Sequence, residues 1–216
     1  MTIPPDAPPA EQLVPSGPVV VVQGQPYIPT TSGVIHLFLA RTAQTTIDLP
    51  AQERRGIAVV DGAVYATSGT TIRRVDPGAR VPGDLVLETN ATAPLTDLVV
   101  TGDSVLALAS DGQLLWLDRA LTRVEAIGAL PPGMTDAELH AAGDRVSATG
   151  TADLAPTTDP AAQSVAVEPV AVLIDDSGIS DTLVVAGGGD VDLAVFASGE
   201  IVLTSGGRAY RVTLPE

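Results

Sequence analysis

Cysteine and lysine are absent from this 216-residue sequence, and aromatic residues make up only 3% of it. Without cysteine the chain has no disulfide, no thiolate metal site and no cysteine nucleophile. Without lysine it has no amine for Schiff-base chemistry and no phosphate-loop lysine. Several classes of enzyme are therefore excluded, and any chemistry falls to carboxylates, hydroxyls, histidines and arginines.

Positive charge is also scarce, because 11 basic residues stand against 26 acidic ones and give a net charge of −15. Affinity for nucleic acid depends on cationic groups that displace counterions, so we expect no nucleic-acid partner. The first residues lack the basic and apolar regions of a signal peptide. No apolar run approaches the roughly 20 residues of a membrane helix. We expect a soluble protein, located in the cytoplasm or in a virion.

Five stretches share one order of features: an apolar strand, a glycine turn, a second apolar strand, a polar turn and a third strand. The glycines that anchor them are separated by 38, 40, 41 and 56 residues: Gly24, Gly62, Gly102, Gly143 and Gly199. A period near 40 is typical of four-stranded propeller blades. The sequence therefore predicts an all-β, five-bladed β-propeller with four-stranded antiparallel blades.

The hydrophobic pattern assigns strands to places within a blade. Continuous apolar runs predict innermost strands that are packed on both faces: 19–22, 57–60 and 193–197. Alternating segments at 85–89 and 123–127 predict outer strands. The long fourth interval is explained by a loop over 151–163, between the second and third strands of the fourth blade, with pairing resumed at Val170.

Residues 1–18 form a separate arm that carries six prolines and favours an extended conformation. The propeller itself spans 19–216, and its last blade ends after three strands. We expect residues 11–14 to add the missing outer strand and so close the ring without a covalent bond. The arm is then held either by this ring or by a neighbouring subunit.

The turn residues resemble those of quinoprotein-like and WD40-like propeller blades: Asp61, Gly62, Asp76, Ser110, Asp111, Gly112 and Asp118. This blade-level resemblance implies the fold only, since propellers host unrelated functions. The tryptophans that mark quinone-binding repeats are not repeated, because Trp116 is the only tryptophan. No cofactor is expected.

Candidate site residues lie near the starts of two innermost strands. Asp97 and Glu138 each precede their anchoring glycine by five residues, so they occupy equivalent positions at one mouth of the central channel, and His140 faces the same side as Glu138. Such a group can serve acid–base chemistry or hold a cation, or it can simply be solvated. The doublet Arg54 and Arg55 is a candidate for docking a partner.

Two acidic loops are weaker candidates for calcium: Asp175 with Asp176, and Asp190 with Asp192. Neither pair follows the EF-hand spacing, and aspartate is common in turns that bind no ion. We therefore expect no metal site.

These features favour a non-enzymatic structural or protein-interaction propeller. We expect it to be an accessory or decoration subunit of a large assembly, such as the virion or tail of a phage, with its protein partner docked in part through the arm. One alternative is a glycan-binding propeller, although Tyr27, Tyr65, Tyr210 and Trp116 are expected in the core rather than on binding platforms. The other is a small hydrolase that uses carboxylates at the channel.

Overall fold

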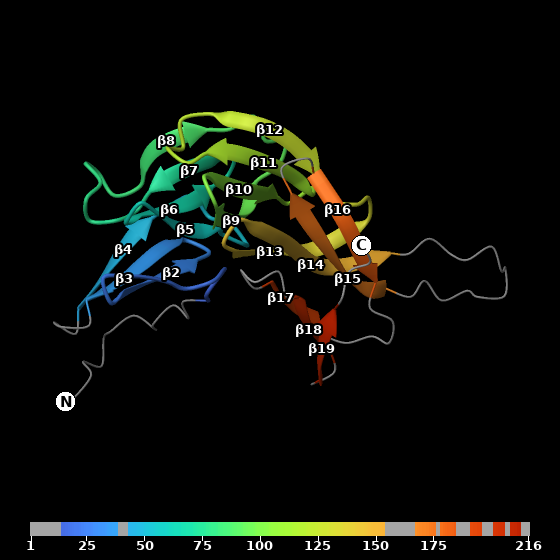
Figure 1. Cartoon of the computed structure of the whole chain (residues 1–216). Coiled ribbons are helices and arrows are strands. Elements are labelled where there is room, and N and C mark those ends of the chain that lie inside the picture. The colour runs from blue at the N-terminus through green and yellow to red at the C-terminus, as the bar shows by residue number, and fades with distance from the viewer. Residues whose placement is uncertain are drawn as a thin grey trace, which may run out of the picture.

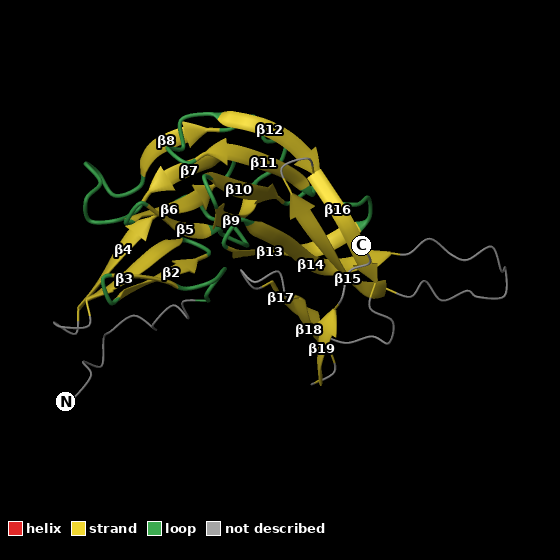
Figure 2. Ribbon diagram, viewed as in Figure 1, coloured by secondary structure: helices red, strands yellow, loops and turns green. Residues whose placement is uncertain are grey.

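The computed structural model describes residues 14–38, 43–153, 167–175, 178–184, 191–195, 201–205 and 208–212. In this part of the chain every regular element is a β-strand (Figure 2). No helix in it has the length and apolar character needed to cross a membrane.

The strands form four antiparallel sheets of four strands and one of three. The first two sheets contain β1 (Val20–Val22), β2 (Gln25–Thr30), β3 (Gly33–Phe38) and β4 (Ala43–Asp48), then β5 (Ile57–Val60), β6 (Ala63–Ser68), β7 (Thr71–Arg74) and β8 (Asp84–Glu88). The third contains β9 (Leu95–Thr101), β10 (Ser104–Ala109), β11 (Gln113–Asp118) and β12 (Val124–Ala129).

The fourth sheet contains β13 (Met134–Ala142), β14 (Arg145–Asp153), β15 (Val167–Asp175) and β16 (Gly178–Val184). The fifth contains β17 (Val191–Val195), β18 (Ile201–Ser205) and β19 (Arg208–Val212). Within every sheet, each strand pairs with the next one along the chain. The loop predicted over 151–163 begins later than expected, because residues 151–153 continue the pairing of β14 with β15.

The sheets follow one another around an arc, with their first strands inside and β8, β12 and β16 outside (Figure 1). The first strands contact one another in chain order: β1 meets β5, β5 meets β9, β9 meets β13 and β13 meets β17. Together with the four-stranded meanders, this order gives the architecture of propeller-like blades and confirms the all-β prediction.

Apolar cores fill the spaces between neighbouring sheets. In β10, Val105, Ala107 and Ala109 pack in the core shared with the second sheet, whereas Leu106 and Leu108 pack in the core shared with the fourth. Successive side chains of a strand point to opposite faces, so a strand between two sheets needs apolar residues at every position. The continuous apolar pattern of the inner strands has this physical cause.

The first sheet departs from that pattern on one face. Val20 and Val22 pack against the core shared with the second sheet, but Val19 and Val21 are 52% and 60% exposed. The expectation that residues 19–22 are packed on both faces is therefore wrong. Its physical reason is position, since β1 belongs to the sheet at one end of the arc.

The core-packing predictions for three of the aromatic residues hold, the side chain of Tyr210 falls outside the described residues, and the predicted alternation of the outer strands is wrong. Tyr27 is buried, Tyr65 packs against the second core, and Trp116 fills space between the third and fourth sheets. β8 does not alternate, because Leu85 is exposed and Leu87 is buried although residues two apart share a face of a regular strand; a bulge in its pairing with β7 lies between them. β12 does not alternate either, because Glu125, Ala126 and Ile127 are all exposed, Ile127 by 52%.

Candidate functional site

Two adjoining pockets open where the chain leads into the first strands of the sheets. The larger has a volume of about 520 Å³ and the smaller about 490 Å³, and both are lined by Glu53, Arg54 and Thr96. The segments that line them come from the starts of β1, β5, β9 and β13. We call this opening the channel mouth.

The smaller pocket brings together four of the five residues that the sequence singles out. Asp97, Glu138, His140 and Arg54 all line it, so the predicted equivalence of Asp97 and Glu138 places them in one site. Both lie beside a bulge in the pairing of a first strand, between Leu95 and Asp97 in β9 and between Thr135 and Glu138 in β13. Bulges of this kind redirect side chains near functional sites.

Asp97 is buried and links the third sheet to the fourth. Its Oδ1 accepts a hydrogen bond from the amide of Leu98 (2.7 Å), and its Oδ2 accepts one from the amide of Leu139 in β13 (2.7 Å). Burial raises the pKa of this carboxyl, although the two amides oppose the rise. Both oxygens are therefore engaged in holding two sheets together.

Three further polar side chains of this pocket, Arg54, Glu138 and His140, are also paired. Arg54 Nη2 donates to Glu138 Oε1 over 2.8 Å, an ion pair that joins the chain before β5 to β13. His140 Nε2 lies 2.8 Å from Thr149 Oγ1 on the neighbouring strand β14. Ser16 differs, because it lines the same pocket at 8% exposure and its hydroxyl has no partner in the described structure.

Arg55 does not belong to this surface. It is fully buried and donates to four backbone carbonyls: Thr30 (3.1 Å), Thr31 (3.5 Å), Pro50 (2.8 Å) and Thr67. Burial lowers its pKa to about 10. The guanidinium fastens the first sheet to the second, so the prediction that Arg55 docks a partner is wrong, and only Arg54 of this doublet reaches the mouth.

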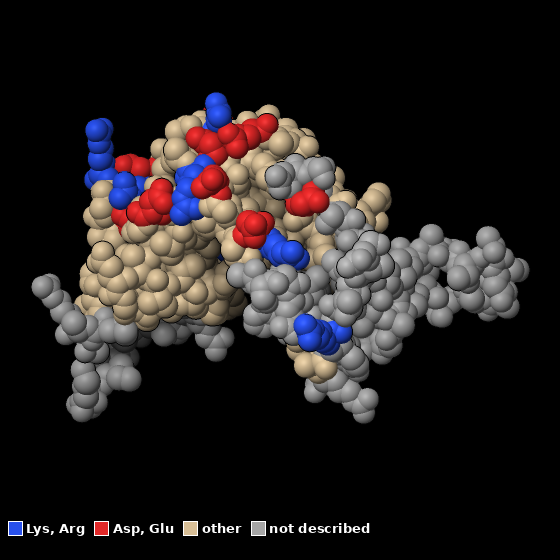
Figure 3. Space-filling view, viewed as in Figure 1, with Lys and Arg blue, Asp and Glu red and all other residues tan. Residues whose placement is uncertain are grey.

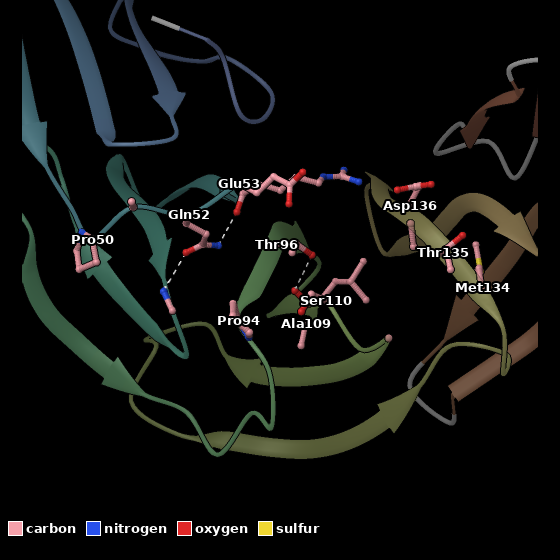
Figure 4. A pocket seen from close by; sticks show the side chains of 16 residues that line it. Pro50, Gln52, Glu53, Pro94, Thr96, Ala109, Ser110, Met134, Thr135 and Asp136 are labelled. Carbon is pink, nitrogen blue, oxygen red and sulfur yellow. Dashed lines mark hydrogen bonds between the residues drawn. The ribbon is translucent and has the colours of Figure 1, made fainter.

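The larger pocket holds residues that the sequence patterns did not reveal. Gln52 crosses from the second sheet to the third: its Nε2 donates to the carbonyls of Arg54 and Leu95, and its Oε1 accepts from the amide of Gly69 over 2.9 Å. Figure 4 shows Glu53 and Asp136 on two sides of the opening. The sequence marks these two residues only by their positions. Glu53 comes shortly before the first strand β5, and Asp136 lies near the start of the first strand β13.

The weaker calcium candidates are not brought together as a site. Asp175 ends β15 and is exposed, and Asp192 lies in β17, while Asp176 and Asp190 fall outside the described residues. Within the described residues, no group of three or more His, Cys, Asp or Glu side chains is arranged to hold a metal ion.

No known family model matches this sequence, and no curated protein matches it. The fold is similar to those of several solved proteins. Hydrazine synthase of Kuenenia stuttgartiensis, which has β-propeller domains, aligns with a TM-score of 0.63 at 13% identity over 88% of this chain. At such identity the similarity concerns the fold alone.

Two further solved structures are similar. PorZ, a surface component of the type-IX secretion system of Porphyromonas gingivalis, aligns with a TM-score of 0.55 at 14% identity over 92% of this chain. The computationally designed protein Ika8 aligns with a TM-score of 0.53 at 11% identity over 90% of it. The chain spans 61% of the hydrazine synthase chain, 26% of PorZ and 57% of Ika8.

Proposed function

We propose that this chain forms a five-bladed β-propeller whose ring is closed by residues 11–14, added to the outer edge of β19. Support comes from the fifth sheet, which among the described residues has three strands where the other four sheets have four. The uncovered face of β1 also supports closure, because an apolar face is stabilised when another sheet covers it. Residues 14–38 contain no charged side chain to oppose such packing, and Figure 3 shows a broad uncharged area below the acidic and basic side chains of the described surface.

Hydrogen exchange tests this closure directly. Amides of residues 208–212 that point away from β18 are expected to exchange slowly in the full chain, because the added strand accepts their hydrogen bonds. Removing residues 1–13 is expected to make them exchange quickly. Equal rates in both proteins would contradict the closing strand.

We propose further that the propeller is a non-enzymatic, protein-binding subunit of a larger assembly. The observation that carries this proposal is that Asp97, Glu138 and His140, the residues predicted for acid–base chemistry, each form bonds within the protein. Asp97 is held by two amides, Glu138 by Arg54 and His140 by Thr149. A hydrolase built on the carboxylates that the sequence singled out would need one of them free to meet a substrate, and a general base within reach of the proton it removes.

An activity screen tests the absence of catalysis. The full chain is incubated with chromogenic glycosides, esters and phosphates, beside the variants Asp97→Asn and Glu138→Gln. No turnover above buffer is expected from any of the three proteins. Turnover by the wild-type protein that disappears in Glu138→Gln would overturn the proposal in favour of a hydrolase.

Glycan binding has less support. Among the described residues, neither pocket is lined by an aromatic side chain, and sugar rings are commonly bound by stacking on such side chains. The more specific assignment, to the virion or tail of a phage, rests on the lack of a catalytic signature in the sequence and on the proline-rich arm. Mass spectrometry of purified particles tests it, and absence of the chain from them would overturn it.

A further inference from the structure

Two carboxylates of the channel mouth differ from the other acids there. Glu53 and Asp136 both line the larger pocket and are exposed, and neither has a hydrogen-bond or ion-pair partner among the described residues. By contrast, Glu138 is paired with Arg54, and Asp97 accepts two amide hydrogen bonds. The negative charges of Glu53 and Asp136 are therefore free to meet a ligand.

The floor of this pocket is apolar. Leu108 and Ala109, each 1% exposed, line it together with Met134 at 9%, and the hydroxyl of Thr96 is turned to the Leu108 carbonyl (3.3 Å). A volume of about 520 Å³ lies within the usual range of ligand pockets. A buried apolar floor below an acidic rim suits a guest with an aliphatic stem and a cationic head.

The electrostatic balance of the mouth favours a cation. Arg54, the cationic side chain that lines the pockets, is already neutralised by Glu138 at 2.8 Å. The remaining free charges, Glu53 and Asp136, are negative, and so is the chain as a whole at −15. Such a field attracts cationic groups from a distance and raises their rate of association.

Two further features of the pockets concern ligand binding: the backbone at Asp136 and the hydroxyl of Ser16. Asp136 has a φ of +51° at the bulge of β13, a conformation that costs energy for a residue with a side chain. The nearly buried Ser16 offers an unpaired hydroxyl in the adjoining pocket. A buried polar group without a partner is costly, but because the Ser16 hydroxyl is almost fully covered, a ligand would reach it only after the residues that cover it move aside.

We propose that the channel mouth binds an extended segment of a protein partner, with an arginine or lysine side chain placed over the apolar floor and between Glu53 and Asp136. This inference rests on the proposed function, because it names the chemistry of the partner for a protein-binding propeller. It requires no change in the Arg54–Glu138 pair.

The test uses the full chain and an array of immobilised heptapeptides. Their central residue is arginine, lysine or citrulline, which is an uncharged analogue of arginine, and the flanking residues are varied in parallel. Peptides with arginine or lysine are expected to retain the protein, and the matching citrulline peptides to lose about tenfold in affinity. The best arginine peptide is then labelled with fluorescein for measurements of anisotropy.

The double variant Glu53→Gln/Asp136→Asn is expected to weaken binding of that peptide about tenfold or more. Asparagine tolerates the left-handed backbone of position 136, so the variant is expected to fold. The control Glu88→Gln/Asp103→Asn removes the same charge from exposed residues outside both pockets and is expected to leave affinity unchanged. Rising salt should weaken the wild-type complex.

Three results would overturn the inference: no retention by any cationic peptide, equal retention by citrulline peptides, or equal loss in the control variant. Its failure is distinguishable from failure of the proposed function. A protein partner that binds the Glu53→Gln/Asp136→Asn variant as tightly as the wild type leaves the proposed function standing and removes only the cationic segment. Turnover of a substrate would instead remove the proposed function.

Discussion

Arg55 fastens two sheets through its guanidinium, and its neighbour Arg54 forms an ion pair that is partly open to water. Replacing Arg55 by alanine leaves carbonyls of Thr30, Pro50 and Thr67 without a donor in a dry interface. We expect Arg55→Ala to lower the free energy of unfolding by about 3 kcal/mol or more. Arg54→Ala is the matched control, and it is expected to cost less than about 1 kcal/mol because its partner stays solvated. Urea denaturation measures both, and similar losses would contradict the structural role of Arg55.

Asp97 gives stability an unusual dependence on pH. Because burial raises its folded-state pKa, the folded protein binds a proton more tightly at this site than the unfolded chain does. The contribution of this group is fully present below the unfolded pKa, about 4, and is lost as the pH rises through the folded-state pKa. We expect the stability difference between wild type and Asp97→Asn to shrink as the pH rises above about 4. Urea titrations of both proteins across that range measure it.

Asp76 provides a control of opposite sign. Burial would raise the pKa of Asp76, but hydrogen bonds from Arg74 and from the amides of Val64 and Gly78 outweigh it and hold the pKa below its usual value. The stability that Asp76 contributes is present above the unfolded pKa and is lost as the pH falls through the folded-state pKa. The difference from Asp76→Asn should therefore grow as the pH rises. Parallel slopes for the two variants would contradict the assignment for Asp97.

The spacing of the sequence predicted that Asp97 and Glu138 lie together at the mouth. It did not predict which groups of the protein form hydrogen bonds with them. Asp97 and Glu138 both lie five residues before a two-residue turn that starts with glycine, Gly102 and Gly143, and this regularity placed them correctly. Their partners Leu139 and Arg54 belong to other sheets, 42 and 84 residues away, so no local pattern reveals them. The sequence also could not predict that Arg55 is buried while its neighbour Arg54 is partly exposed, because the partners of Arg55 are distant in the sequence.

The second and third sheets approach each other closely where Gly56 meets β9. In the second sheet the turn is Asp61-Gly62, with glycine in its second place, so the position equivalent to Asp97 is Gly56 and not Ile57. A Cβ at Gly56 would lie 2.5 Å from the carbonyl carbon of Asp97 and 2.6 Å from the nitrogen of Leu98. Backbone atoms cannot move aside as a flexible side chain can. A small residue here lets two sheets pack together.

We expect Gly56→Ala to destabilise the protein by about 3 kcal/mol, since the added methyl group overpacks two backbones. Gly24→Ala serves as the control. It has a φ of +75° and nothing within 4 Å of the added Cβ, so it should cost only about 1 kcal/mol of conformational strain. Chemical denaturation compares the two variants. Equal losses would show that close approach at Gly56 is not limiting.

The repeat predicted the positions of the strands more reliably than it predicted which of their faces are buried. A period near 40 residues marked each meander, because every sheet repeats the same strands and turns. Periodicity could not reveal that β1 has one exposed face, since Val19 and Val21 read like the packed valines beside them. Burial depends on which sheet stands opposite, and that is a property of the arrangement around the channel.

At the scale of the whole molecule, the N-terminal segment contributes to stability. In the described structure, residues 14–18 already dock at the junction of the first two sheets: the Ser16 amide donates to Pro29 (3.0 Å) and the Arg55 amide donates to Ser16 (2.9 Å). Deleting all of residues 1–18 would remove these bonds together with the proposed closing strand. A deletion of residues 1–13 separates the two effects, because it removes most of the strand and keeps the docked segment.

We expect deletion of residues 1–13 alone to lower the melting temperature by several degrees, as loss of a closing strand exposes the edge of β19 and the apolar face of β1. Deletion of residues 1–18 should lower it further by the loss of the docked segment. Differential scanning calorimetry of the three proteins measures both steps. An unchanged melting temperature after the shorter deletion, with a fall after the longer one, would assign the whole effect of the arm to docking at Ser16 and would remove the closing strand.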